Sequence, residues 1–263
     1  MAKKLTIKEL LDSKGKRKYT EVHPTNEEEC RACEEAGIDM LIVENQVEMV
    51  RRGAPNTFLT VGAMNREVAG SDKGAILTGI DRMTRGADAV YTGQSLDRVR
   101  AMAREKIPVV GHVGLVPYRS SWYGGLRAVG KNAPDALSIY KEVLAYQEAG
   151  AIAVEMEVVP EKIATEISKR VDIIVISLGS GQSCDVQYLF ACDILNITDG
   201  RIPRHAKSYV DLKSEMDRIQ HMRVNAFKDF HNEVTGGLFP ARKNNIKIDD
   251  REYEIFMSEI DKL

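Results

Sequence analysis

The stretch Ala149-Gly150-Ala151-Ile152-Ala153-Val154-Glu155-Met156-Glu157 closes a helical segment and runs directly into an apolar strand. A glycine at such a point ends the helix and lets a short loop turn into a sheet. The same arrangement occurs at residues 36–39 and 86–89. This weak internal repeat predicts successive units in which a helix leads into a buried strand.

Other short apolar runs extend the pattern along the chain. Candidate strands cover residues 18–22, 40–43, 58–61, 89–91, 109–112, 151–157 and 173–177. Continuous apolar strands separated by helices indicate a parallel sheet that is covered on both faces. Seven or eight such units in 263 residues predict an α/β protein with a (β/α)8 TIM barrel. A doubly wound sheet is the alternative, although no glycine-rich fingerprint follows the first strand.

Composition excludes several classes of protein. The chain has 43% hydrophobic residues, 37 Lys and Arg against 39 Asp and Glu, and a formal net charge of −2. Ordinary apolar content with a small net charge argues against disorder, and the absence of a basic excess argues against a nucleic-acid or membrane-surface binder. Because no apolar run is long enough for a membrane span or a signal peptide, we expect a cytoplasmic protein.

The chain is expected to form one barrel domain, residues 1–263, with a helical extension from about residue 206. Leu212, Met216, Ile219, Met222 and Phe227 recur at helical spacing in this extension, which predicts core packing or a homo-oligomer face. Cys30 and Cys33 form a CxxC pair within a predicted helix. Without a second such pair, we interpret them as buried thiols in preference to a metal or redox site.

Polar side chains follow several of the predicted strands. In a (β/α)8 barrel, chemistry takes place where the strands end. These strand ends supply the candidate functional residues: His23, Glu44, Asn45, Gln46, Tyr91, His112, Glu155, Glu157, Ser177 and Ser180.

Glu155 and Glu157 lie two residues apart on one strand, so their side chains point the same way. A carboxylate in a partly desolvated barrel mouth can act as a general base, and we assign this role to Glu157. The alternative is an ion pair with a rim Lys or Arg. His112 is a second catalytic candidate, and the glycine-containing stretch 111–131 suits an active-site cover or an oligomer interface.

Motifs along most of the chain carry a resemblance to a known family. They include Gly111-His112-Val113-Gly114-Leu115 and Glu157-Val158-Val159-Pro160, together with segments 15–20, 35–39, 51–56, 86–90, 124–131, 179–185 and 236–240. As a set they resemble ketopantoate hydroxymethyltransferase, of the phosphoenolpyruvate/pyruvate superfamily. The resemblance implies a (β/α)8 barrel, homo-oligomers and transfer of a one-carbon unit from methylenetetrahydrofolate to α-ketoisovalerate. It also implies a Mg²⁺ ion on the keto acid and Glu157 as the base.

The resemblance fails where the family binds its metal. Asn45 and Ala63 stand where the family has metal-binding Asp residues, and Gly93 stands where it has a metal-linked Glu. Gln46 replaces a substrate-binding Ser, and Tyr91 replaces a substrate-binding Lys. A hard cation without carboxylate ligands binds poorly, so a magnesium site of the family type is not expected. Glu44 and His23 are the residues that remain for a different metal.

Three functions stay open from the sequence. The first is a divergent enzyme that makes or breaks a bond next to a carbonyl, with Glu157 as acid or base and a small carbonyl compound or keto acid as substrate. Its expected substrate contacts are Glu44, Asn45, Gln46, Tyr91, Ser177 and Ser180. The second is the family's own hydroxymethyltransferase with a rebuilt metal site. The third is a non-catalytic oligomeric scaffold.

Overall fold

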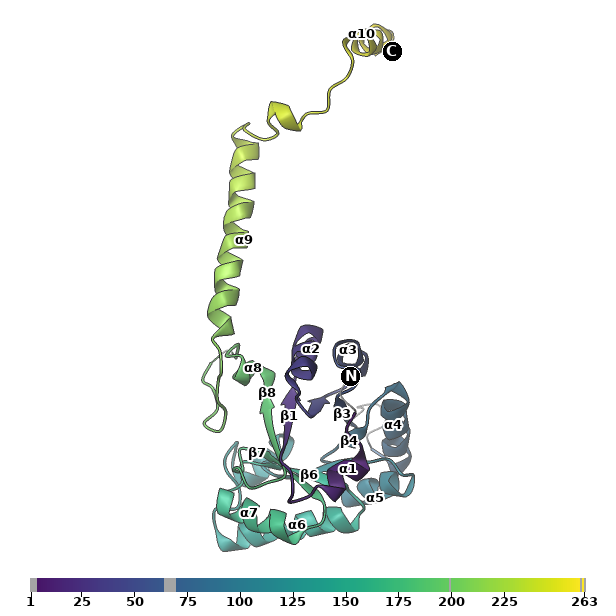
Figure 1. Cartoon of the computed structure of the whole chain (residues 1–263), viewed down its shortest axis with the longest axis vertical. Helices are drawn as coiled ribbons and strands as arrows, with labels where there is room; N and C mark the ends of the chain where they lie inside the picture. Colours follow the sequence, from purple (N-terminus) through teal and green to yellow (C-terminus); the bar gives the residue numbers. More distant parts are fainter. Residues whose placement is uncertain (1–3, 64–69, 199, 261, 263) are drawn as a thin grey trace. The chain divides into compact units, whose positions relative to one another are not determined.

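The computed structural model describes residues 4–63, 70–198, 200–260 and 262. It divides the chain into two compact units, Met1–Val210 and Asp211–Leu263. The first unit contains a closed barrel of eight parallel strands in sequential order. The prediction of a (β/α)8 TIM barrel is therefore confirmed (Figure 1).

Seven of the eight strands match the predicted runs within a few residues. The exception is β8, which follows the glycine-containing loop after β7 and was not among the predicted strands. The strands are β1 (Tyr19–His23), β2 (Met40–Val43), β3 (Phe58–Gly62), β4 (Ala89–Tyr91), β5 (Val109–Gly114), β6 (Ala153–Glu157), β7 (Ile174–Leu178) and β8 (Val186–Phe190).

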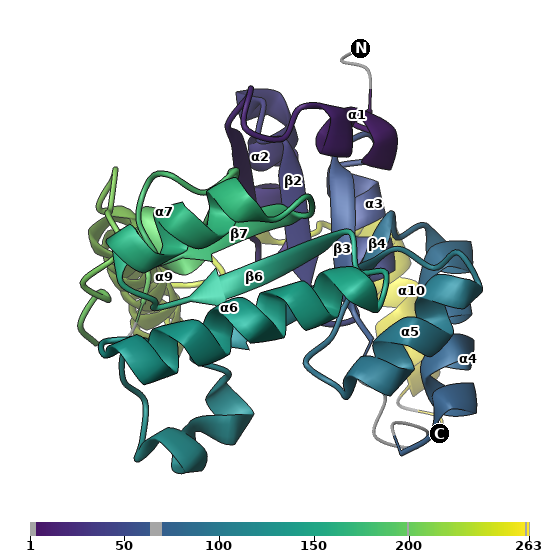
Figure 2. The same ribbon diagram turned by 90° about the horizontal axis from the view of Figure 1, so that it is seen from below.

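Helices alternate with these strands, and α6 and α7 cover the outside of β6 and β7 (Figure 2). Gly37 and Gly86 end α2 and α4 with positive φ angles of 79° and 115°, as the repeated glycines predict. The helices of this unit are α1 (Ile7–Asp12), α2 (Glu27–Ala36), α3 (Val47–Gly53), α4 (Asp72–Arg85), α5 (Leu96–Arg104), η1 (Pro117–Tyr123), α6 (Ala133–Glu148), α7 (Glu161–Arg170) and α8 (Ala191–Ile194).

The barrel interior changes character from one end to the other. Near the start of the strands it is filled by apolar side chains such as Met40, Phe58 and Ile174. Since alternate residues of a strand share a face, the inward positions further along are Glu21 on β1, His112 on β5 and Glu155 on β6. The interior therefore becomes polar toward the carboxyl ends of the strands.

Gly111 provides a test of the packing between the barrel and its helices. A Cβ atom at Gly111 would lie 2.5 Å from two ring carbons of the buried Tyr146 on α6. We expect Gly111→Ala to lower the free energy of unfolding by about 1–3 kcal/mol, because the ring has no room to move. Urea denaturation measures this, with Gly70→Ala as the control, since nothing lies within 4 Å of a Cβ at Gly70. Equal stability of the two variants would contradict the packing argument.

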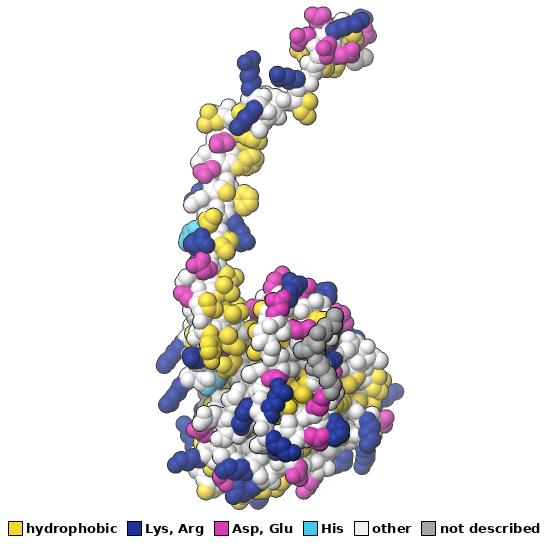
Figure 3. All heavy atoms as spheres, in the orientation of Figure 1, with side chains coloured by type: hydrophobic (Ala, Val, Ile, Leu, Met, Phe, Trp, Pro, Cys, Tyr) yellow, Lys and Arg dark blue, Asp and Glu magenta, His cyan; other side chains and the backbone are white. Residues whose placement is uncertain are grey.

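The second unit holds α9 (Leu212–Thr235), η2 (Arg242–Asn244) and α10 (Asp250–Ile260). None of the described residues of α9 is buried, so the expectation that its stripe forms core is not met. Hydrophobic side chains are instead exposed along this helix, including Met216, Met222 and Phe227 (Figure 3). The predicted homo-oligomer stays a prediction. Among the described residues, no helix combines the length and the apolar character needed to cross a bilayer.

The CxxC pair lies in α2, with Cys30 buried and Cys33 half-buried. Both thiols are free, and burial raises the pKa of each to about 11. A thiol with such a pKa is a poor nucleophile at neutral pH. This environment agrees with the interpretation of the pair as buried thiols.

Candidate active site

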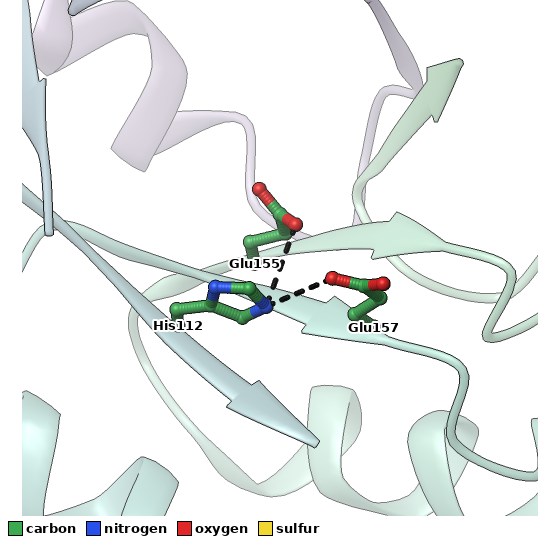
Figure 4. A group of neighbouring side chains, drawn as sticks. All are labelled: His112, Glu155 and Glu157. Carbon is green, nitrogen blue, oxygen red and sulfur yellow. Dashed lines mark hydrogen bonds and ion pairs between the residues drawn. The ribbon is translucent and has the colours of Figure 1, made fainter. Parts of the chain in front are cut away.

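His112, Glu155 and Glu157 meet at the carboxyl-terminal mouth of the barrel (Figure 4). The strand register places His112 of β5 opposite Glu155 of β6, and Gly114 opposite Glu157. The two glutamates are two residues apart on β6, so both reach the same inner face, as the sequence predicts. The side chain of Glu157, at the end of its strand, is 15% exposed, whereas Glu155 is fully enclosed.

The imidazole of His112 links these groups. Its Nε2 lies 3.1 Å from Oε2 of Glu157 and 3.6 Å from Oε1 of Glu155. Its Nδ1 is hydrogen-bonded to the hydroxyl of Tyr91 on β4. Neither carboxylate forms a rim ion pair with a Lys or Arg among the described residues, in contrast to the alternative considered for Glu157.

Burial and the charges of neighbouring groups shift the pKa values of Glu155, His112 and Tyr91. Burial, reinforced by the charge of Glu157, raises the pKa of Glu155 to about 7, against the opposing effect of His112. Burial opposes protonation of His112, but the hydrogen bond to Glu157 and the two carboxylate charges outweigh it and raise its pKa. Burial and the charge of Glu155 hold the pKa of Tyr91 well above its usual value, so its hydroxyl keeps its proton.

A further carboxyl group, Glu21, lies deeper in the barrel. Its side chain is 1% exposed, and neither of its oxygens has a hydrogen-bond partner in the described part of the chain. Burial, then the charge of Glu155, raises the pKa of Glu21 to about 8, and the nearby Thr60 hydroxyl opposes this only weakly. Glu21 is therefore an uncharged acid at neutral pH.

A cavity of about 320 Å³ opens above these groups. Six residues predicted from the sequence line it: His23, Glu44, Tyr91, His112, Glu155 and Glu157. The complete lining is His23, Ile42, Val43, Glu44, Gly62, Tyr91, Thr92, Gly93, His112, Pro117, Tyr118, Glu155, Glu157, Leu178, Tyr188 and Phe190. A hollow of about 580 Å³, lined among others by Arg17, Tyr19 and Asp39, lies at the opposite end of the strands, where barrels do not carry out chemistry.

Four of the predicted substrate contacts do not line this cavity. Asn45 and Gln46 are exposed where α3 begins, and the Gln46 side chain accepts a hydrogen bond from the Asn45 backbone. Ser177 donates its hydroxyl proton to the Gly181 carbonyl, and Ser180 donates to the Met156 carbonyl. None of these four residues lines the cavity, and their role in substrate binding stays a prediction.

Tyr118, Tyr188 and Phe190 line the cavity, and Glu21 lies deeper in the barrel; sequence reasoning missed all four. The sequence did contain a signal for Glu21. Tyr19, Glu21 and His23 share one face of β1, and a charged residue is not expected on the face of a strand that points into the core. Tyr188 and Phe190 lie on β8, the strand that was not predicted. Tyr118 lies on η1, inside the stretch 111–131, and its hydroxyl donates to the Gly93 carbonyl. Part of that stretch therefore does cover the site.

The positions that hold the metal in the resembling family do not fit a magnesium ion here. Ala63 presents a buried methyl group, and Asn45 is an exposed amide. A Cβ at Gly93 would lie 2.9 Å from the hydroxyl oxygen of Tyr118, so the space for a longer side chain is already filled. Magnesium requires oxygen ligands in a near-octahedral arrangement, which an amide, a methyl group and a glycine do not supply.

One other group has metal-ligand chemistry. His112, Glu155 and Glu157 offer ligand atoms that all lie within 4.8 Å of one another. The 3.1 Å separation between His112 and Glu157 is, however, a direct hydrogen bond. The arrangement is thus that of a coupled acid and base facing a cavity.

Comparisons with known proteins agree with the fold and the motifs. The family description "Ketopantoate hydroxymethyltransferase" matches residues 44–242. The chain is 36% identical to 3-methyl-2-oxobutanoate hydroxymethyltransferase 1 of Methylibium petroleiphilum, over 86% of this chain and 75% of that protein. It is 32% identical to 3-methyl-2-oxobutanoate hydroxymethyltransferase of Staphylothermus marinus, over 96% of this chain and 99% of that protein.

Solved structures support the fold. A 2,3-dimethylmalate lyase of the PEP mutase/isocitrate lyase superfamily is 12% identical with a TM-score of 0.56, covering 86% of this chain and 89% of that one. A phosphonopyruvate hydrolase, solved with oxalate and Mg²⁺, is 11% identical with a TM-score of 0.55, over 91% and 93%. The family match and the sequence relatives show that the chain belongs to the ketopantoate hydroxymethyltransferase family and is an enzyme of the transferase type.

Proposed function

We propose that this enzyme makes or breaks a bond next to a carbonyl group, with Glu157 as the acid or base. The observation that carries the proposal is the Glu157 carboxylate, which faces the cavity and is hydrogen-bonded to His112, itself hydrogen-bonded to Tyr91. Such a chain fixes the position of the base.

The proton transfer balances with residues of this chain alone. Glu157 takes the proton from the carbon next to the carbonyl, and the electron pair of that C–H bond moves toward the carbonyl oxygen. The protonated form of Glu155 lines the cavity and can donate a hydrogen bond to this oxygen. The resulting enolate can then attack an electrophile, and the reverse sequence would break the same bond.

The proposal uses no step at a magnesium ion, because the residues at the family positions do not fit one. The names of the relatives contain 3-methyl-2-oxobutanoate, so this keto acid belongs in the test, with and without Mg²⁺. If its exchange required Mg²⁺, the family reaction with a rebuilt metal site would hold instead.

Hydrogen–deuterium exchange tests the proposal directly. Proton NMR in D₂O follows the hydrogens next to the carbonyl in hydroxyacetone, aminoacetone and 3-methyl-2-oxobutanoate, with enzyme and with buffer alone. We expect enzyme-dependent exchange without added metal in at least one compound. No acceleration in any of them, with a folded enzyme, would contradict the proposal and favour a non-catalytic role.

A further inference from the structure

The ionisable groups around the cavity give it a negative character. Two carboxylates line it, Glu44 beyond β2 and Glu157 on β6, together with Glu155, whose pKa of about 7 leaves it partly protonated. No Lys or Arg is among the described residues of the lining. Arg119 reaches the Gly93 carbonyl beside the cavity, but its guanidinium lies 3.6 Å from the carboxylate of Glu142 and is paired with it. His112 can carry a positive charge, but it is hydrogen-bonded to Glu157. A bound anion would therefore meet the carboxylates with no unpaired cation among the described residues of the lining.

The wall formed by β1 and β8 is aromatic. The ring of Phe190 lies 5.2 Å from that of His23 and 5.3 Å from that of Tyr188, measured between centroids. All three rings line the cavity. Burial lowers the pKa of His23, so its imidazole is neutral at physiological pH. The faces of aromatic rings carry negative potential and attract cations, most effectively organic cations that have shed their water.

From these two observations we infer that the substrate is a small carbonyl compound bearing a positively charged amine or ammonium group. The carboxylate of Glu44 and the rings of Tyr188 and Phe190 would hold the cation, with the carbonyl toward Glu155 and Glu157. This inference rests on the proposed function for the carbonyl part, but the selection of positive charge depends only on the lining of the cavity. Anionic keto acids are disfavoured by the same groups.

A metal ion is a poorer occupant of this cavity than an organic cation. Magnesium and calcium need several oxygen ligands around one point. Here the aromatic rings form a wall that offers such an ion no ligand atoms except at the Tyr188 hydroxyl and the ring nitrogens of His23. An alkylammonium group gains from both the rings and the carboxylates.

A matched series of ligands tests the charge selection. Aminoacetone, hydroxyacetone and acetoacetate share one ketone framework and carry a positive, a neutral and a negative substituent. Isothermal titration calorimetry with the full chain is expected to rank them in that order. We expect aminoacetone to bind about 100-fold more tightly than acetoacetate, since one charge reversal beside a partly buried carboxylate is worth several kcal/mol.

Variants localise the effect. Glu44→Gln removes one exposed carboxylate at the cavity and is expected to weaken aminoacetone binding about threefold to fivefold, with little effect on hydroxyacetone. Glu35→Gln makes the same change on the exposed surface of α2 and should leave the ranking unchanged. Tighter binding of acetoacetate or 3-methyl-2-oxobutanoate than of aminoacetone would overturn the inference. So would displacement of aminoacetone by micromolar Mg²⁺ or Zn²⁺, which would make the site a metal site.

Exchange measured on the same samples separates this inference from the proposed function. If aminoacetone binds best but shows no Glu157-dependent exchange, the charge selection stands and the proposed chemistry is wrong. If an anionic keto acid exchanges with dependence on Glu157 and aminoacetone does not bind, the proposed chemistry stands and the charge selection is wrong.

Discussion

Replacing Glu157 by Gln is expected to lower the rate of hydrogen exchange next to the carbonyl by about 10³-fold, within the range of general acid–base catalysis. Glutamine keeps the size of the side chain and a contact with His112, but it cannot take a proton. The base is therefore lost while the cavity keeps its shape. Proton NMR in D₂O with the most rapidly exchanging compound measures the effect, alongside circular dichroism to confirm the fold.

Two comparisons make the Glu157→Gln result specific. Glu35→Gln, on the exposed surface of α2, should exchange at the wild-type rate. Aminoacetone should still bind to Glu157→Gln, because Glu44 and the aromatic wall remain. If Glu157→Gln retained a rate within tenfold of the wild type, Glu157 would not be the base. Glu155, whose pKa of about 7 also suits proton transfer, would then take its place.

Glu21→Gln is expected to make the protein more stable at pH 8 relative to the wild type than at pH 5. In the folded state the pKa of Glu21 is raised from 4.5 to about 8, so the folded protein keeps a proton that the unfolded chain releases. Above pH 4.5 ionisation therefore stabilises the unfolded chain, and this loss of stability grows until the folded group ionises near pH 8. Glutamine does not ionise, so the Glu21→Gln variant lacks this pH-dependent loss of stability.

The expected change is large because Glu21 is fully enclosed. Between pH 5 and pH 8 the stability difference between Glu21→Gln and the wild type should move by about 3 kcal/mol in favour of the variant. Urea denaturation at both pH values measures it. Glu35→Gln should show no such trend. A pH-independent difference for Glu21→Gln would mean that Glu21 ionises normally in the folded barrel.

Much of the barrel could be predicted from the order of residues along the chain. Apolar runs such as Met40–Val43 and the repeated helix-ending glycines act over a few residues, so local sequence is enough to place them. β8 was not predicted because its apolar run is short, is interrupted by Gln187 and Tyr188, and follows a long loop. The same local logic placed Glu155 and Glu157 on one face of β6, because strand alternation has a fixed period of two.

Which residues come together in the site, by contrast, depends on how the strands pair to close the barrel. His112 and Glu157 are 45 positions apart in the sequence, and Tyr91 lies on a third strand; only the pairing of β4, β5 and β6 brings them into contact. Ser177 and Ser180 satisfied the strand-end rule, but Ser177 donates its hydroxyl proton to the Gly181 carbonyl in the loop and Ser180 donates to the Met156 carbonyl on β6. The sequence by itself determined the barrel and its family, through local periodicity and matching motifs. Which polar groups share the cavity, and which of them are buried enough to have shifted pKa values, was decided by the tertiary structure, because desolvation and charge coupling depend on distances between strands.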